Sequence, residues 1–193
     1  MKKENNILFI GAEKSSLHFI KSILDSLPEN FDFPIFICIP YVKANKVNFI
    51  NYLSSDNNHK IVNPKADEII ENGKIYVAAP FVHTFLTSNK TFYLSREYTK
   101  YYHQPSIDLS LLSFIEQFQQ NITAIVFPNS LKEGIFGLKK LKSVNGKVLI
   151  CNNQDSKINC DCSCYTEIIG GDNCYDINQI INCLSKNIQY AEY

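Results

Sequence analysis

The residues that could do chemistry in this sequence follow its short apolar runs. The first run ends in "ILFIGAEKSS", where Glu13 comes straight after a Gly-Ala turn and is followed by Ser15 and Ser16. In an α/β protein this first turn often carries a nucleophile or a phosphate-binding loop. A dinucleotide loop needs several glycines so that backbone can approach phosphate, whereas this turn has one glycine and a carboxylate that would repel phosphate. Nucleotide binding is therefore not expected at this turn.

The same turn also has a plainer interpretation, as an ordinary helix start. An acidic side chain is favourable near the positive end of a helix macrodipole, and a serine commonly caps the first turn. Other candidates follow later apolar runs. They are Cys38 in "ICIP", His83 in "APFVH", His103 in "YHQPSID", and Ser130 and Glu133 in "PNSLKEG".

Seven cysteines give an odd count, which favours reduced thiols over a disulfide framework. Three of them alternate in "NCDCSCY", at Cys160, Cys162 and Cys164. Zinc sites usually space their thiols as C-x2-C, so this alternation suits one face of an extended segment better than a structural zinc site. We expect small, buried side chains here, and neither a metal site nor a cofactor.

The elements that must position these residues alternate between apolar runs and amphipathic stretches. "NILFI", "PIFIC", "KIYVA", "TAIVF" and "KVLI" are predicted as central strands, and residues 17–27, 46–55, 106–119, 133–144 and 177–186 as helices. Strands that are apolar throughout are typical of a parallel sheet covered on both faces. "FLTSNKTFYLS" reads as an antiparallel hairpin at one edge of that sheet. The fold class is therefore doubly wound α/β, with ligands expected beyond the carboxyl ends of the strands.

Composition limits the kinds of partner. The 193 residues carry 19 basic and 19 acidic side chains, so there is no global field to attract nucleic acid. The basic start "MKKENN" is followed by too few apolar residues for a signal peptide, and no run approaches the 18 or so apolar residues of a membrane span. We expect one domain over residues 1–193, without membrane insertion and in the cytoplasm.

Five stretches, read in order, resemble the catalytic domain of CheB-type chemotaxis protein-glutamate methylesterases. They are "IGAEKS", "SILDSLPENFDFPIFICIP", "GKIYVAAPFVH", "YHQPSIDLSLLS" and "KEGIFGLKKL". The family motifs they resemble are I-G-A-S-T-G-G, F-P-x-P-I leading to Q-H-x-P, G-x-x-Y-x-A-P, H-R-P-S-x-D and G-M-G-x-D-G-A. The resemblance spans about residues 7 to 182 and implies the same fold. We expect no receiver domain before this stretch, and therefore no phosphorylation control of the family's usual kind.

The resemblance implies ester hydrolysis at methylated glutamates of chemoreceptors by a Ser-His-Asp triad. By position, the serine falls on Glu13, the histidine on Cys38 and the aspartate on Glu133. All three catalytic residue types have changed, while scaffold-like residues persist. We expect Glu13, Cys38 and Glu133 to cluster at the carboxyl end of the sheet. The expected rim of that pocket is Ser15, Ser16, His83, His103 and Ser130.

Three hypotheses follow. The first is a catalytically inactive pseudoenzyme that binds a protein partner, a chemoreceptor or another signalling protein. The second is an active esterase whose nucleophile has moved to Ser15 or Ser16, with His83 or His103 as base; catalytic geometry tolerates displacement of about an angstrom poorly, which disfavours it. The third is a small-ligand or metal site formed by Glu13, Cys38 and Glu133, although such mixed oxygen and sulfur ligand sets are uncommon.

Overall fold

The centre of the molecule is a seven-stranded parallel sheet. The computed structural model describes residues 6–40, 48–98, 103–152 and 163–189. The strands lie in the order β3 (Lys60–Val62), β4 (Lys74–Val77), β2 (Ile35–Cys38), β1 (Ile7–Gly11), β7 (Ile122–Val126), β8 (Lys147–Cys151) and β9 (Cys174–Tyr175). The chain winds outward from β1 first toward β3 and β4 and later toward β8 and β9. The doubly wound α/β fold is therefore confirmed.

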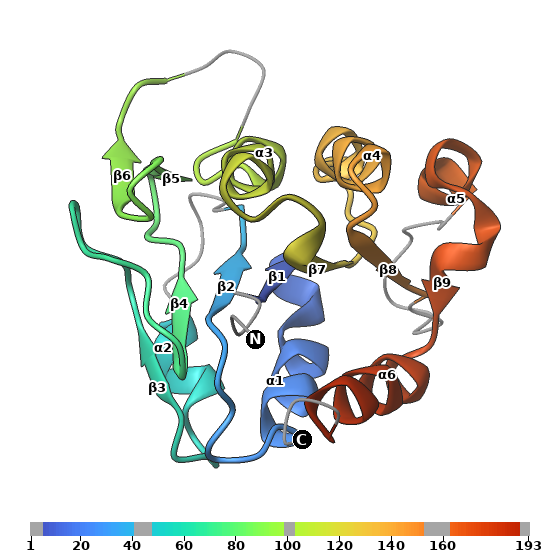
Figure 1. The fold of residues 1–193 in the computed structure, drawn as a ribbon, viewed down its shortest axis with the longest axis horizontal. Coiled ribbons are helices and arrows are strands. Elements are labelled where there is room, and N and C mark those ends of the chain that lie inside the picture. The colour runs from blue at the N-terminus through green and yellow to red at the C-terminus, as the bar shows by residue number, and fades with distance from the viewer. Residues whose placement is uncertain (1–5, 41–47, 99–102, 153–162, 190–193) are drawn as a thin grey trace, which may run out of the picture.

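Helices cover both faces of this sheet, as Figure 1 shows. The helices α1 (Leu17–Asp25), α2 (Phe49–Leu53) and α6 (Ile177–Gln189) pack on one face, and α3 (Ile107–Phe118), α4 (Ile135–Ser143) and α5 (Ser163–Ile169) on the other. The central strands β1 and β2 are buried at every position, because each of their two faces meets a helical layer. Their side chains alternate between two cores, so that Phe9, Phe36 and Cys38 face α3 while Leu8 and Ile37 face α1.

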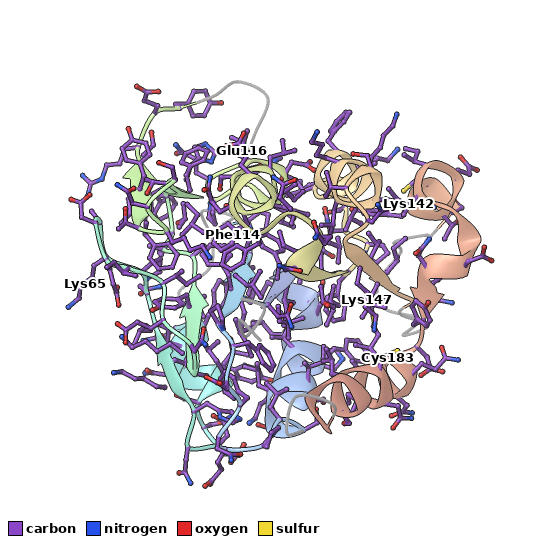
Figure 2. The ribbon with its side chains drawn as sticks, viewed as in Figure 1. Lys65, Phe114, Glu116, Lys142, Lys147 and Cys183 are labelled. Carbon is purple, nitrogen blue, oxygen red and sulfur yellow. The ribbon has the colours of Figure 1, made fainter. Side chains whose placement is uncertain are left out.

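The predicted antiparallel hairpin consists of β5 (His83–Leu86) and β6 (Phe92–Ser95). It forms a two-stranded sheet of its own and adds no strand to the main sheet. In Figure 1 it lies in the same layer as α3, on the side of β4. Its buried Phe92 meets Phe114, which lies on the inner side of α3 (Figure 2), and Ser113 Oγ accepts a hydrogen bond from Leu86 N at 3.1 Å. The hairpin therefore takes the place that a helix has elsewhere in this layer.

The five predicted central strands and the five predicted helices are all present. The sequence analysis missed β3, β9 and α5, together with the short 3₁₀ helices η1 (Lys14–Ser16), η2 (Gln119–Asn121) and η3 (Gly171–Asn173). Strands of two or three residues are too short to show a periodic pattern. Among the described residues, no helix combines the length and the apolar character needed to cross a membrane.

Candidate functional site

The three expected site positions belong to the carboxyl ends of neighbouring strands: Cys38 ends β2, Glu13 follows β1, and Glu133 lies in the loop after β7. These strands are neighbours in the sheet, with Gly11 of β1 paired to Cys38 of β2 and to Val126 of β7. Ala12 N donates a hydrogen bond to the Cys38 carbonyl at 3.1 Å, and Phe127 N donates to the Gly11 carbonyl at 2.9 Å. The turn that carries Glu13 and the loop that leads to Glu133 therefore leave adjacent strands.

Glu133 is almost fully buried and holds the start of α3. Its Oε2 atom accepts hydrogen bonds from Ser106 Oγ at 2.9 Å, Ile107 N at 3.0 Å and Asp108 N at 3.3 Å. Its Oε1 atom accepts a fourth bond, from His103 N, at 3.3 Å. Backbone N–H groups at a helix start lack partners within the helix and favour an anion. The carboxylate of Glu133 is thus already engaged by the amino end of α3.

Cys38 lies on the same side of the sheet and is completely buried. Its Sγ atom is 3.9 Å from Ser110 Oγ of α3. Burial raises the pKa of the Cys38 thiol far above its usual range, and the negative charge of Glu133 raises it further. The thiol is therefore neutral at physiological pH, and can act neither as a thiolate nucleophile nor as a base in the place of an imidazole.

Glu13 makes a separate set of contacts. Its Oε2 atom accepts hydrogen bonds from Ser130 N at 3.3 Å and Ser130 Oγ at 3.0 Å, and its Oε1 atom accepts one from Ser15 Oγ at 2.8 Å. Within the described part of the chain, no hydrogen bond joins Glu13 to Cys38 or to Glu133. Three donors of the turn and the loop thus converge on a carboxylate that belongs to the protein itself.

The expected rim residues divide into exposed and buried ones. Ser15 and Ser130 are exposed, and the His103 side chain is 47% exposed, with Nδ1 3.6 Å from Glu133 Oε1. Ser16 and His83, by contrast, are buried, and neither the Ser16 hydroxyl nor a ring nitrogen of His83 has a hydrogen-bond partner. Burial lowers the pKa of His83, against an opposing effect of the Glu133 charge. Ser16 and His83 therefore do not lie on an exposed rim, because the fold encloses both side chains almost completely.

Two polar residues, Asn129 and Tyr165, organise the loop before α4. Asn129 Oδ1 accepts a bond from Glu133 N at 3.0 Å, and its Nδ2 donates to the Glu133 carbonyl at 3.0 Å and to Tyr165 Oη at 2.9 Å. Tyr165, on α5, donates its hydroxyl to the same carbonyl at 2.8 Å. An asparagine after a strand is a recognisable turn residue. Nothing in the local sequence points to Tyr165, which α5 brings in from 32 residues away.

Neither alternative site finds support in these contacts. Among the described residues, neither Ser15 nor Ser16 hydrogen-bonds a histidine, and no group of three or more His, Cys, Asp and Glu side chains is arranged to hold a metal ion. Cys160 and Cys162 lie outside the described residues, and Cys164 is a half-buried residue of α5.

Comparisons with known proteins agree on one family. The family model described as CheB methylesterase matches residues 8–161. A putative protein-glutamate methylesterase/protein-glutamine glutaminase of Leptospira interrogans (strain Fiocruz L1-130) is 27% identical over 143 residues, which is 74% of this chain and 74% of that protein. Protein-glutamate methylesterase/protein-glutamine glutaminase 5 of Geobacter metallireducens is 24% identical over 77% of this chain and 43% of its own length.

A solved structure has the same fold. The catalytic domain of the Thermotoga maritima CheB methylesterase superposes with a TM-score of 0.82, covering 95% of this chain and 99% of that domain at 18% sequence identity. The arrangement of strands and helices is therefore retained although most side chains differ.

Proposed function

This chain belongs to the CheB methylesterase family. Because the motif resemblance puts Glu13, Cys38 and Glu133 in the places of the family's catalytic triad, we propose that the chain is a pseudoenzyme that binds a protein partner. The partner we propose is a chemoreceptor or another signalling protein. Residues 1–193 act as one domain in this proposal, which the seven-stranded sheet that runs through the described residues supports.

The observation that carries this proposal is the state of Cys38. Ester hydrolysis by a serine needs a base within hydrogen-bond reach to take the hydroxyl proton. The position equivalent to that base holds a completely buried thiol whose pKa is raised and whose nearest polar contact is Ser110 Oγ. No substitution at the nucleophile position alone can supply the missing base.

Glu13 adds a second obstacle. A catalytic site for acyl transfer needs free donors aimed at the oxyanion that forms during the reaction. Ser130 N, Ser130 Oγ and Ser15 Oγ instead donate to the Glu13 carboxylate, whose negative charge would also repel an oxyanion. The loop donors nearest the nucleophile position are thus occupied.

The experiment is an activity assay with two substrates, because the curated relatives are named for both methylesterase and glutaminase activity. Purified protein is incubated with methylated chemoreceptor and with the corresponding glutamine-containing receptor, and released methanol and ammonia are measured. A CheB catalytic domain with an intact triad serves as the positive control. We expect neither product above background from this chain.

Turnover by the native chain would overturn the proposal, and variants then identify the nucleophile. Loss of turnover in Ser15→Ala or Ser16→Ala would establish the displaced-serine mechanism. Loss in Cys38→Ala would establish a thiol nucleophile despite its burial. Binding is tested separately, by measuring whether the inactive chain is retained by immobilised receptor cytoplasmic domain.

A further inference from the structure

The outward face of α4 carries one large apolar side chain among lysines. Ile135, Gly137, Leu138 and Leu141 turn toward the core and are buried. Phe136 is 68% exposed, and Lys139 and Lys140, three and four residues further along, are exposed on the same side of the helix. Lys132, which precedes the helix, is exposed as well. We call Lys132, Phe136, Lys139 and Lys140 the α4 face.

The lysines of the α4 face lack acidic partners. Within the described residues, no carboxylate lies within ion-pair distance of Lys132, Lys139 or Lys140. Two lysines elsewhere behave differently: Lys21 pairs with Asp25 and Asp56, and Lys74 pairs with Glu68 and Glu71. Since the whole chain has equal numbers of acidic and basic residues, the α4 face is a local excess of positive charge.

Helix electrostatics explain only part of this arrangement. A lysine near the carboxyl end of a helix, such as Lys140, is stabilised by the negative end of the macrodipole. The same dipole disfavours a cation at the amino end, where Lys132 lies, and it gives no reason to expose a phenylalanine. Phe136 leaves a large apolar surface in water at the centre of the cationic group, which is the arrangement of an anchor residue within a polar rim.

The width of the α4 face indicates the class of partner. Figure 1 shows α3, α4 and α5 side by side in one layer. The neighbouring helices carry exposed acids, Glu116 on α3, labelled in Figure 2, and Glu167 on α5. The cationic strip is therefore about one helix diameter wide, roughly 10 Å. A lipid surface or a nucleic-acid duplex would extend over the flanking acids, whereas a single protein segment fits between them.

We infer that the α4 face is a docking surface for an acidic protein segment that carries an apolar side chain to meet Phe136. This inference rests on the proposed protein-binding function, and assigns it a surface and a partner chemistry. The α4 face begins next to the candidate site, because Glu133 directly precedes Gly134 at the start of α4 and Ser130 contacts Glu13. A segment bound there lies alongside the loop of residues 129–133.

The test uses a fluorescein-labelled synthetic peptide helix with glutamates on one face and leucines on the other. Its binding to the full chain is followed by fluorescence anisotropy at low and at high salt. A peptide with lysine in place of every glutamate, anionic phosphatidylserine vesicles and a DNA duplex are measured in parallel. The test variants are Phe136→Ala and the pair Lys139→Glu and Lys140→Glu, and the control is the pair Lys60→Glu and Lys65→Glu, which reverses two exposed charges near the opposite end of the sheet.

We expect the acidic peptide to bind, and high salt to weaken it, because the attraction is between exposed charges. Each test variant should weaken binding by about tenfold or more, and the control by less than about twofold. Equal weakening by test and control variants would overturn the docking surface. So would failure of the acidic peptide to bind, or tighter binding of vesicles or DNA that depends on Lys139 and Lys140. Methanol release by the native chain would refute the pseudoenzyme without changing these results, so the two failures are distinguishable.

Discussion

Glu133 and Asp108 each accept a hydrogen bond from the start of the helix that follows or contains the other residue. Glu133 precedes α4 but its carboxylate accepts hydrogen bonds at the amino end of α3, while Asp108, in the first turn of α3, accepts one at 2.8 Å from Gly137 N in the first turn of α4. The two helices approach closely here, since a Cβ atom on Gly137 would lie 2.8 Å from the Leu111 side chain. The Glu133 carboxylate thus has a structural role where α3 and α4 meet.

Replacing Glu133 should destabilise the fold. Glu133→Ala removes the acceptor of Ser106 Oγ, Ile107 N and Asp108 N, and leaves these donors buried without partners. We expect a loss of about 2–4 kcal/mol in the free energy of unfolding, measured by urea denaturation. Glu133→Gln, which keeps an acceptor oxygen, should cost less. A loss below about 0.5 kcal/mol in Glu133→Ala would contradict the capping role.

The contribution of Asp108 to the stability of the fold should decrease as pH rises. Burial raises the pKa of Asp108 above its ordinary value of 3.8, an effect opposed by the Gly137 and Gly134 N–H groups and reinforced by the Glu133 charge. The folded state therefore binds more protons than the unfolded state between pH 3.8 and the raised pKa, and the stability contribution of Asp108 falls as pH rises through that window. The difference in unfolding free energy between the native chain and Asp108→Asn, measured from acidic to neutral pH, should follow this fall.

Asp56, an acid on the surface, provides a control whose contribution to stability should change with pH in the opposite direction. The hydrogen bond from Lys21 lowers the pKa of Asp56, so its contribution to stability should be lost as pH falls through the lowered pKa. The native chain and Asp56→Asn should therefore differ more at neutral pH than in acid. If both substitutions gave the same sign of pH dependence, the assignment for Asp108 would be wrong.

His83 should destabilise the fold in mild acid. Burial lowers the pKa of His83 below its ordinary value of 6.5, so the unfolded state binds the extra proton between the lowered pKa and pH 6.5. The contribution of His83 is complete above that window and is lost as pH falls through it. His83→Phe removes the titrating group without removing a hydrogen bond found in the structure. Thermal melts from pH 5 to pH 8, about one and a half units either side of the ordinary pKa, should show a smaller acid-induced drop in this variant. An equal drop would show that other groups cause it.

Cys38 should react more slowly than the half-buried cysteines of the described residues. It is completely buried and its thiol pKa is raised, whereas Cys164, Cys174 and Cys183 are half-buried. We expect iodoacetamide at mildly alkaline pH to modify Cys38 at least about tenfold more slowly than those three, because the thiol must first be exposed by local opening. Peptide mass spectrometry of timed samples measures each rate. Modification of Cys38 first would indicate an accessible, activated thiol and would reopen the question of catalysis.

Repair of the nucleophile alone should not restore activity. Glu13→Ser supplies a hydroxyl and frees the donors of Ser130, but no imidazole lies at position 38 to take the proton. We expect no methanol release from methylated receptor by this variant. The triple variant Glu13→Ser, Cys38→His and Glu133→Asp should release a trace, because triad members act as a unit. Activity in the single variant would show that another group serves as base.

The sequence by itself determined the layers of this fold. Apolar runs such as "ILFI" and "IFIC" must be buried on both sides, and amphipathic stretches such as residues 17–25 must cover them. Both requirements follow from the hydrophobic pattern of each segment, which is a local property of the sequence. The order of the five family-like stretches also predicted that Glu13, Cys38 and Glu133 belong to the ends of strands or to the loops that follow them, and the strands concerned, β1, β2 and β7, are neighbours in the sheet.

Only the tertiary structure decided what these side chains do. The direction of each depends on partners that are far away in the chain: Glu133 meets α3 across 26 residues, Glu13 meets Ser130 across 117, and Tyr165 reaches the loop of Asn129 from α5. The burial of His83 and Ser16 likewise depends on packing between elements and leaves no trace in the local sequence. Hydrogen bonds and burial between distant segments are set by how the helical layers meet the sheet, and for that reason the local sequence does not predict these contacts.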